Sequence, residues 1–272
     1  IHKAIAEITT VPAPAALTYD GTERELIAAG AVVDPAGVPV EYALSEDGLY
    51  STDFPKGTNA GEYTVWYRIQ ETANYTGEAP QSVKATIAKK SVVPVITLDE
   101  THFVYDGTAK EPVVTLKEAG GTTEIPAGEY TVEYSGNVNV GTATVTVTAK
   151  NDGNYSFNAV TESFTIGKKQ AEVLTAPEAA GDPLTFNTRA QKLVTPGAGT
   201  GGTMVYSTDN VTFQAQIPTE ANARTYKVYY KVKGDVNHSD SAVGEVSVTI
   251  APKTVKDPTI TLFGEDGDPL VS

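Results

Sequence analysis

The sequence contains an internal repeat, and this repeat limits the folds that the chain can adopt. Three landmarks recur in the same order along its 272 residues. The first landmark is an opening motif that reads TYDGTE from Thr18, VYDGTA from Val104 and TFNTRA from Thr185. Its copies lie about 80 to 90 residues apart, so each repeat has the size of a small domain.

The other two landmarks have the residue pattern of strands. The second reads NAGEYTVWY from Asn59, NVGTATVTV from Asn139 and NARTYKVYY from Asn222. The third is a closing apolar stretch that reads TIAKK from Thr86, TIGKK from Thr165 and TIAPK from Thr249. Between such stretches lie clusters of turn-forming residues, and the chain has 24 glycines and 16 prolines. Short β-branched and aromatic segments separated by turns predict an all-β fold.

The landmarks divide the chain into three predicted repeats, which cover residues 1–89, 90–168 and 169–253. The linkers between the repeats, and the one that follows the third, are very short: Lys89-Lys90, Lys168-Lys169 and Pro252-Lys253. Because almost no free linker separates neighbours, we expect the repeats to abut and the array to behave as a semi-rigid rod.

Both ends of the chain resemble parts of further repeats. Residues 1–3 read IHK, which matches the tail of a repeat, as in IAK and IGK. Residues 254–272 contain GDPL, which also stands at the head of the third repeat. We therefore expect residues 254–272 to supply the opening strands of a truncated fourth repeat.

The first and third repeats share a stretch that the second lacks. YALSEDGLY, from Tyr42, resembles YSTDNVTF, from Tyr206, and both have the pattern of a hairpin. The second repeat passes from EYTVEYSG directly into NVNVG. The order of repeats is therefore long, short, long.

Taken together, these motifs resemble bacterial MBG-type and related immunoglobulin-like repeats, which occur in tandem in large cell-surface and secreted proteins. The resemblance covers essentially the whole chain. It implies tandem immunoglobulin-like β-sandwich domains in an extended array, and an extracellular location on a bacterial surface or after secretion. The family is defined by structural residues and has no shared catalytic set. The third repeat departs from the pattern at Asn187-Thr188, where Asp-Gly is expected.

The opening motif has the chemistry of a turn. Its residues are Asp20 and Gly21 in the first repeat, Asp106 and Gly107 in the second, and Asn187 in the third. Glycine takes the positive φ that such turns require, and aspartate accepts hydrogen bonds from nearby backbone. Asparagine can replace aspartate in a turn, whereas a catalytic carboxylate could not become an amide without loss of its chemistry. We therefore assign the motif a structural role.

Period-two alternation in the second landmark predicts two faces. The expected core face consists of Tyr63, Val65, Tyr67, Ile69, Ala143, Val145, Val147, Ala149, Tyr226, Val228, Tyr230 and Val232. On the opposite face stand Trp66, Arg68 and Tyr229, whose rings and charge suit contact with a sugar or a protein partner. The alternative, which we favour, is that they are cross-strand partners on a half-exposed sheet.

A triplet of the form Asn-X-Ser/Thr occurs once per repeat at an equivalent place. Its copies begin at Asn74, Asn154 and Asn237, and a fourth triplet begins at Asn210. Such triplets are glycan acceptors in eukaryotic secreted proteins. In a bacterial repeat we favour a structural role, in which the asparagine closes a turn and the following ring packs inward.

The composition argues against several other functions. The net charge of −14 disfavours nucleic acid as a partner, and no apolar run is long enough to insert in a membrane. The chain has no cysteine. Its histidines, His2, His102 and His238, share no metal-ligand spacing, and the acidic groups at Asp47, Asp152 and Glu265–Asp268 do not match a calcium loop. We therefore expect no cofactor and no metal.

The sequence thus predicts a non-catalytic spacer or stalk, adhesin-like, in a large bacterial surface or secreted protein. Its expected partners are other repeats of the same polypeptide. The alternative is a module that binds a surface glycan or a host protein through its outer-face aromatic residues or the hairpins of the first and third repeats.

Overall fold

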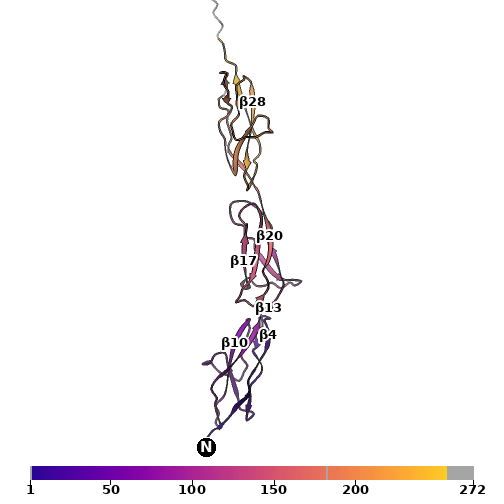
Figure 1. Cartoon of the computed structure of the whole chain (residues 1–272), viewed down its shortest axis with the longest axis vertical. Coiled ribbons are helices and arrows are strands. Elements are labelled where there is room, and N and C mark those ends of the chain that lie inside the picture. The colour runs from indigo at the N-terminus through magenta and orange to yellow at the C-terminus, as the bar shows by residue number, and fades with distance from the viewer. Residues whose placement is uncertain (1, 182, 256–272) are drawn as a thin grey trace, which may run out of the picture. The chain divides into compact units, whose positions relative to one another are not determined.

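The computed structural model describes residues 2–181 and 183–255, and these residues form an all-β structure (Figure 1). The one helical element in this part of the chain is the 3-10 turn η1 (Ala127–Glu129). Threonine, valine, isoleucine and tyrosine are frequent at strand positions, as their side-chain shapes favour. The described residues form two compact units. Unit 1 comprises residues 2–102, 110–137 and 142–165, and unit 2 comprises 103–109, 138–141, 166–181 and 183–255.

The first sequence segment, residues 1–89, has a four-stranded sheet of order β4-β12-β10-β8. β10 pairs with β12 and β8 antiparallel, and β12 pairs with β4 parallel. The same segment also contains the short pairs β1-β11, β2-β7, β3-β6 and β5-β9. The strands are β1 (Ala4–Ile5), β2 (Glu7–Thr10), β3 (Ala13–Pro14), β4 (Ala16–Thr18), β5 (Arg24–Glu25), β6 (Ile27–Ala29), β7 (Val32–Asp34), β8 (Val40–Ala43), β9 (Lys56–Gly57), β10 (Gly61–Ile69), β11 (Tyr75–Thr76) and β12 (Gln81–Ala88).

The second segment, residues 90–168, has an equivalent sheet of order β15-β20-β18-β17, together with the pairs β13-β19 and β14-β16. The second landmark forms β18, and the closing apolar stretch forms the end of β20. The strands are β13 (Lys90–Ser91), β14 (Pro94–Leu98), β15 (His102–Val104), β16 (Val114–Glu118), β17 (Tyr130–Ser135), β18 (Gly141–Ala149), β19 (Tyr155–Ser156) and β20 (Val160–Gly167).

The third segment, residues 169–253, repeats the arrangement as β23-β30-β28-β26, with β28 and β30 antiparallel and β30 and β23 parallel. The pairs β21-β29, β22-β25 and β24-β27 complete it. The strands are β21 (Lys169–Gln170), β22 (Glu172–Thr175), β23 (Leu184–Thr185), β24 (Gln191–Lys192), β25 (Ala198–Thr200), β26 (Gly202–Ser207), β27 (Thr219–Glu220), β28 (Thr225–Gly234), β29 (His238–Ser239) and β30 (Gly244–Ala251).

The core of each segment lies against one face of its four-stranded sheet. Along β10, the residues Val65, Tyr67 and Ile69 are buried, and the residues between them are not. Val65 and Tyr67 pack in one core cluster with Leu26, Ile27, Tyr42, Ala85 and Ile87. Ile69 packs in a second cluster with Ala6, Val33 and Val38. Tyr226, Val228 and Val232 are the buried residues of β28, whereas Tyr230 is half-buried. The alternation that the sequence predicts is therefore present, although Tyr63, Ala149 and Tyr230 are half-buried.

The hairpins of the first and third segments are closed in the same way. Tyr42 exchanges two backbone hydrogen bonds with Ser51, and Tyr206 exchanges two with Gln214. The hydroxyl of Tyr42 also accepts the N–H of Ala31, and that of Tyr206 accepts the N–H of Gly197, both at 3.0 Å. The sequence similarity of these stretches thus corresponds to an equivalent structure.

Residues 256–272, in which we expect the opening strands of a fourth repeat, lie outside the described residues, and so does the acidic cluster Glu265–Asp268. In the part of the chain that is described, no helix has the length and apolar character needed to cross a bilayer.

Candidate functional site

The opening motif forms a turn held by one carboxylate oxygen. In the first copy, Oδ1 of Asp20 accepts the backbone N–H of Thr22 at 2.9 Å and the Thr22 hydroxyl at 2.6 Å. In the second copy, Asp106 binds Thr108 in the same way, at 2.9 and 2.7 Å. The residue between them is Gly21 with φ 79° or Gly107 with φ 85°, as such a turn favours.

The third copy keeps the acceptor and loses the glycine. Oδ1 of Asn187 accepts the N–H of Arg189 at 3.0 Å, and the intervening Thr188 has φ 66°. A β-branched residue with positive φ is strained, so the neighbouring structure must hold it there.

The carboxylate of Asp20 is poorly suited to act as a base. Hydrogen bonds from Thr22 and then from Arg24 hold the pKa of Asp20 well below its usual range. A general base works best with a pKa near the working pH, so these contacts oppose proton abstraction and favour a turn.

The outer-face residues Trp66, Arg68 and Tyr229 do not form one site. Trp66 and Arg68 lie two positions apart on β10 of unit 1, and Tyr229 lies on β28 of unit 2. Arg68 binds the carboxylate of Glu41 at 3.1 Å and stands 4.0 Å above the ring centroid of Tyr50. Its charge is therefore already paired within the first segment.

The sheet register also accounts for the two rings. Trp66 stands between Ala43 and Ser82 on the neighbouring strands, and Tyr229 stands between Ser207 and Glu245. Both rings are half-buried. This placement fits the cross-strand role, and whether either ring contacts a ligand stays a prediction.

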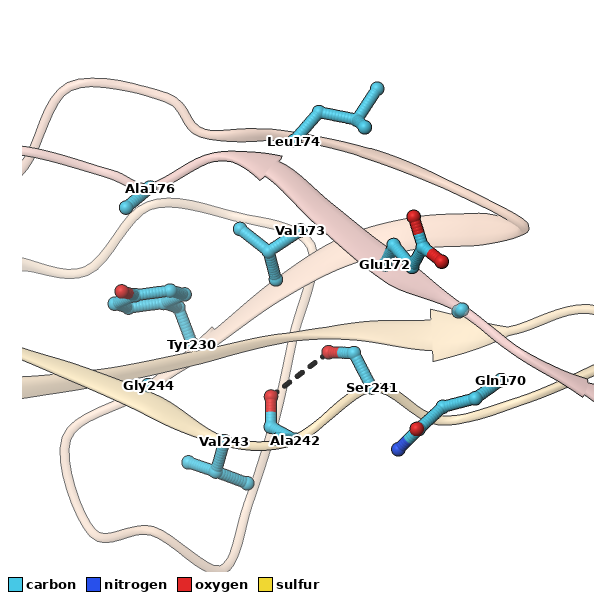
Figure 2. A pocket seen from close by; sticks show the side chains of 11 residues that line it. Gln170, Glu172, Val173, Leu174, Ala176, Tyr230, Ser241, Ala242, Val243 and Gly244 are labelled. Atoms are coloured by element: carbon cyan, nitrogen blue, oxygen red, sulfur yellow. Dashed lines mark hydrogen bonds between the residues drawn. The ribbon is translucent and has the colours of Figure 1, made fainter.

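Unit 2 contains a groove of about 720 Å³ between β22 and the segment Ser241–Gly244 (Figure 2). The regular β28-β30 ladder ends at the pair Tyr230–Gly244. Two residues further along β28, the backbone N–H of Val232 donates to Oγ of Ser241, and the N–H of Ser241 donates to the Val232 carbonyl. From Tyr230 to Val232 the chain advances two residues, whereas from Gly244 back to Ser241 it advances three. The extra residue makes a β-bulge at Ala242 and Val243.

The ring of Tyr230 lines this groove and depends on a glycine. A Cβ atom built on Gly244 would stand 2.3 Å from Cζ of Tyr230, so only glycine leaves room for the ring in this position. In Figure 2, Val173 reaches toward the groove from β22, and Leu174 points away from it. Within the described residues β22 pairs with β25 alone, so its other backbone edge faces the groove.

The groove is not apparent from the sequence, because alternation assigns Tyr230 to the core face. The available signal is Gly244 at the first position of a strand, opposite an aromatic residue. The groove lining combines apolar side chains, a strand edge and the carboxylate of Glu172, and it has no nucleophile-base pair. Its chemistry suits binding.

The triplet asparagines have a second role that the sequence does not reveal. In unit 1, Oδ1 of Asn154 accepts the backbone N–H of Ala60 at 2.7 Å, 94 residues away in the chain. Its Nδ2 donates to Glu129 at 2.9 Å and approaches Oδ1 of Asn59 at 3.4 Å. Asn154 therefore binds the turn that begins the second landmark of the preceding segment.

Two further contacts in unit 1 accompany this one. The ring of Tyr155 meets that of Tyr19 edge-on, with centroids 5.6 Å apart. Nζ of Lys89 donates to the carbonyl oxygens of Lys150 and Asn151 at 3.1 and 2.7 Å. The opening motif, the closing lysine and the triplet thus meet in one place.

Unit 2 repeats this set of contacts with its own residues. Oδ1 of Asn237 accepts the N–H of Val140, and its Nδ2 donates to Oδ1 of Asn139, both at 3.0 Å. The ring of His238 meets that of Tyr105 edge-on at 5.3 Å. Nζ of Lys168 donates to the carbonyl oxygens of two residues of the Asp235–His238 turn, at 3.1 and 3.2 Å.

The remaining triplets differ from these two. Asn74 is exposed, and among the described residues no hydrogen bond of its side chain is found. Asn210 has φ 60° in the hairpin of the third segment, a conformation that asparagine tolerates.

The histidines are dispersed. His2 and His102 are exposed, and Nδ1 of His238 lies 2.7 Å from Oδ1 of Asp235. Across residues 2–181 and 183–255, no three histidine, aspartate or glutamate side chains cluster as a metal site would require. That folding needs no metal stays a prediction, made from the spacing of these residues in the sequence.

No protein-family model matches the sequence, and no curated protein matches it. Among solved structures, it is similar to the SGBP-B protein of the Bacteroides ovatus mixed-linkage glucan utilization locus in complex with a mixed-linkage heptasaccharide, at 12% identity, 92% coverage of this chain, 71% of that chain and TM-score 0.22. It is also similar to Drosophila N-cadherin EC1-4, at 12% identity, 92% coverage of this chain, 73% of that chain and TM-score 0.27. A third similar structure contains three N-terminal domains of the bacteriophage RB49 outer capsid protein Hoc, at 16% identity, 92% coverage of this chain, 98% of that chain and TM-score 0.24. TM-scores this low carry no argument about function.

Proposed function

We propose that this chain is a non-catalytic spacer, built from tandem immunoglobulin-like β-sandwich repeats, in a large bacterial cell-surface or secreted protein. One observation carries the proposal. The contacts of Asn154, Tyr155 and Lys89 in unit 1 recur as those of Asn237, His238 and Lys168 in unit 2. We call each of these two sets of contacts a joint, and a spacer of tandem repeats needs equivalent joints between successive repeats.

The chemistry of the polar residues supports this function. The aspartates of the opening motif accept hydrogen bonds from the turns that they close, and Arg68 is paired with Glu41. The triplet asparagines bind backbone and other amides. These side chains serve structure, and none is poised as a nucleophile with an adjacent base.

The joints can be tested by NMR relaxation on the full chain. If the contacts hold neighbouring repeats together, the segments tumble with similar, long correlation times. In the double variant Asn154→Ala and Asn237→Ala, the correlation times should shorten and separate. Asn158→Ala, at an exposed asparagine, is the matched control and should change nothing. Independent tumbling of the segments in the unaltered chain would contradict the proposal.

A ligand-binding module is the second candidate, and the groove beside Tyr230 favours it. A half-buried ring beside an open strand edge suits stacking against a sugar. A glycan array with the unaltered chain, Tyr230→Ala and Trp66→Ala tests this candidate. Loss of binding in Tyr230→Ala would assign the ligand to the groove, and loss in Trp66→Ala to the outer face of β10. An array that retains no glycan would exclude carbohydrate as the ligand.

A further inference from the structure

The first segment carries the same contact surface as the second and third, in the same local structure. β11 pairs parallel with β1, as β19 pairs with β13 and β29 with β21. In each case a backbone N–H donates to the carbonyl of the triplet asparagine. The distances are 2.8 Å from Ala4 to Asn74, 2.9 Å from Lys90 to Asn154 and 3.2 Å from Lys169 to Asn237. The backbone that presents the asparagine is therefore equivalent in the three segments.

The side chains on this surface of the first segment also correspond to those of the other two. Asn74 holds the place of Asn154, Tyr75 that of Tyr155, and Lys3 that of Lys89. Lys3 forms an ion pair with Glu71, whereas Lys89 donates to backbone carbonyls. Tyr75 is half-buried against a core cluster, whereas Tyr155 is buried where Tyr19 covers it. The exposed side chain of Asn74 has no hydrogen-bond partner in the described chain. The side-chain amides of Asn154 and Asn237 therefore have hydrogen-bond partners, whereas that of Asn74 has none among the described residues.

We propose that Asn74 and Tyr75 form a docking surface for the tip of another repeat of this fold. The partner presents a turn whose first residue is asparagine, as at Asn59 and Asn139, with a Tyr-Asp-Gly turn beside it. Oδ1 of Asn74 accepts the backbone N–H that follows the partner's asparagine, and the partner's tyrosine ring meets Tyr75 edge-on. This inference rests on the proposed spacer function and names the partner of its open end.

The small number of contacts indicates how the surface works. Two or three neutral hydrogen bonds and one ring pair are too few to hold separate molecules together at micromolar concentration. A short linker gives an effective concentration on the order of millimolar, which makes the same contacts sufficient. The surface is therefore suited to a repeat that a short linker tethers beside it.

The test is an extended chain in which a copy of residues 90–165 precedes the full chain. Ile1-His2-Lys3 then replaces Ile166-Gly167-Lys168 of the added copy, so that linker length is unchanged. Asparagine is labelled with ¹⁵N, and solvent exchange of the side-chain amides is measured by NMR. The Asn74 signal is assigned by its loss in Asn74→Ala. The exposed Asn210 is the internal control.

We expect exchange of the Asn74 amide to slow about tenfold or more on addition of the copy, toward the rates of Asn154 and Asn237, with Asn210 unchanged. An unchanged Asn74 rate beside slow Asn154 and Asn237 rates would overturn this inference alone. Equally fast exchange at all three would overturn the spacer function as well. If the added copy fails to fold, a copy of residues 1–86 replaces it, because the tip of that segment binds Asn154.

Discussion

At the scale of single residues, one side-chain oxygen fixes each opening turn. Asp20, Asp106 and Asn187 each accept the N–H of the residue two positions later. The geometry needs an acceptor and a positive φ at the intervening residue, and it does not need a negative charge. This explains why aspartate and asparagine alternate here while the turn persists.

The strained residue of the third turn gives the first prediction. Thr188→Gly should stabilise the chain by about 1 kcal/mol, because glycine adopts φ 66° without strain. Arg189→Gly, one residue later and without positive φ, is the matched control and should destabilise by about 0.5–1 kcal/mol. Urea unfolding followed by circular dichroism measures both. A loss of stability in Thr188→Gly would show that the turn tolerates threonine without strain.

The second prediction concerns acid. The folded-state pKa of Asp20 is depressed, so its contribution to stability is present above the unfolded value of about 3.9 and is lost as pH falls through the lower folded pKa. Asp20→Asn keeps the acceptor for Thr22 and loses the ion pair with Arg24. The variant should therefore melt below the unaltered chain at pH 6, and the difference should shrink as pH falls to 2. A difference in melting temperature that is the same at both pH values would contradict this account.

The opening turns can be predicted from the sequence because the interacting atoms are two residues apart. The contacts of Asn154 and Asn237 cannot, because their partners are 94 and 97 residues away and no local pattern marks them. What the sequence does contain is recurrence, since the triplets at Asn154 and Asn237 each lie one repeat after a landmark that also begins with asparagine. That recurrence indicates equivalent roles without indicating which atoms meet.

At the scale of strands, the departures from regular alternation position the groove. The ladder between β28 and β30 ends at Tyr230–Gly244, and the bulge at Ala242 and Val243 follows. Alternation correctly predicts that Tyr226, Val228 and Val232 are buried. It fails in part at Tyr230, which is half-buried and lines the groove beside the bulge. A one-residue change of register is not visible in a period-two pattern.

The third prediction is that Gly244→Ala displaces the ring of Tyr230. The new Cβ would overlap the ring, so the side chain must move and the chain should lose about 1–3 kcal/mol of stability. Gly128→Ala is the matched control, since a Cβ there meets nothing and φ is not positive. Its effect should stay within about 0.5 kcal/mol. Chemical shifts of the Tyr230 ring report the displacement, and unchanged shifts would contradict it.

At the scale of the whole molecule, the segments differ in detail and agree in plan. Each has a four-stranded sheet in which the second landmark pairs with the closing strand, and the hairpins of the first and third close alike. The order long, short, long, which the sequence predicts, corresponds to hairpins in the outer two segments. The plan is predictable because the landmarks coincide with the central strands.

The fourth prediction is that folding of the whole chain requires no metal. Thermal unfolding with and without EDTA should give the same midpoint. A decrease of roughly 10 °C or more in EDTA would correspond to several kcal/mol of linked binding and would contradict the metal-free account. Adding Ca²⁺ after EDTA would then identify whether that ion is responsible.

The central claim, a spacer of tandem repeats, is tested most directly by small-angle X-ray scattering of the full chain in dilute solution. Three domains joined end to end by very short linkers should give a maximum dimension of roughly 100 Å, if strands of about seven residues at 3.3 Å plus loops set each domain's length. A chain of this length folded into one globule has a radius of gyration of about 19 Å. The account predicts the elongated particle, and a compact particle near the globular value would contradict it.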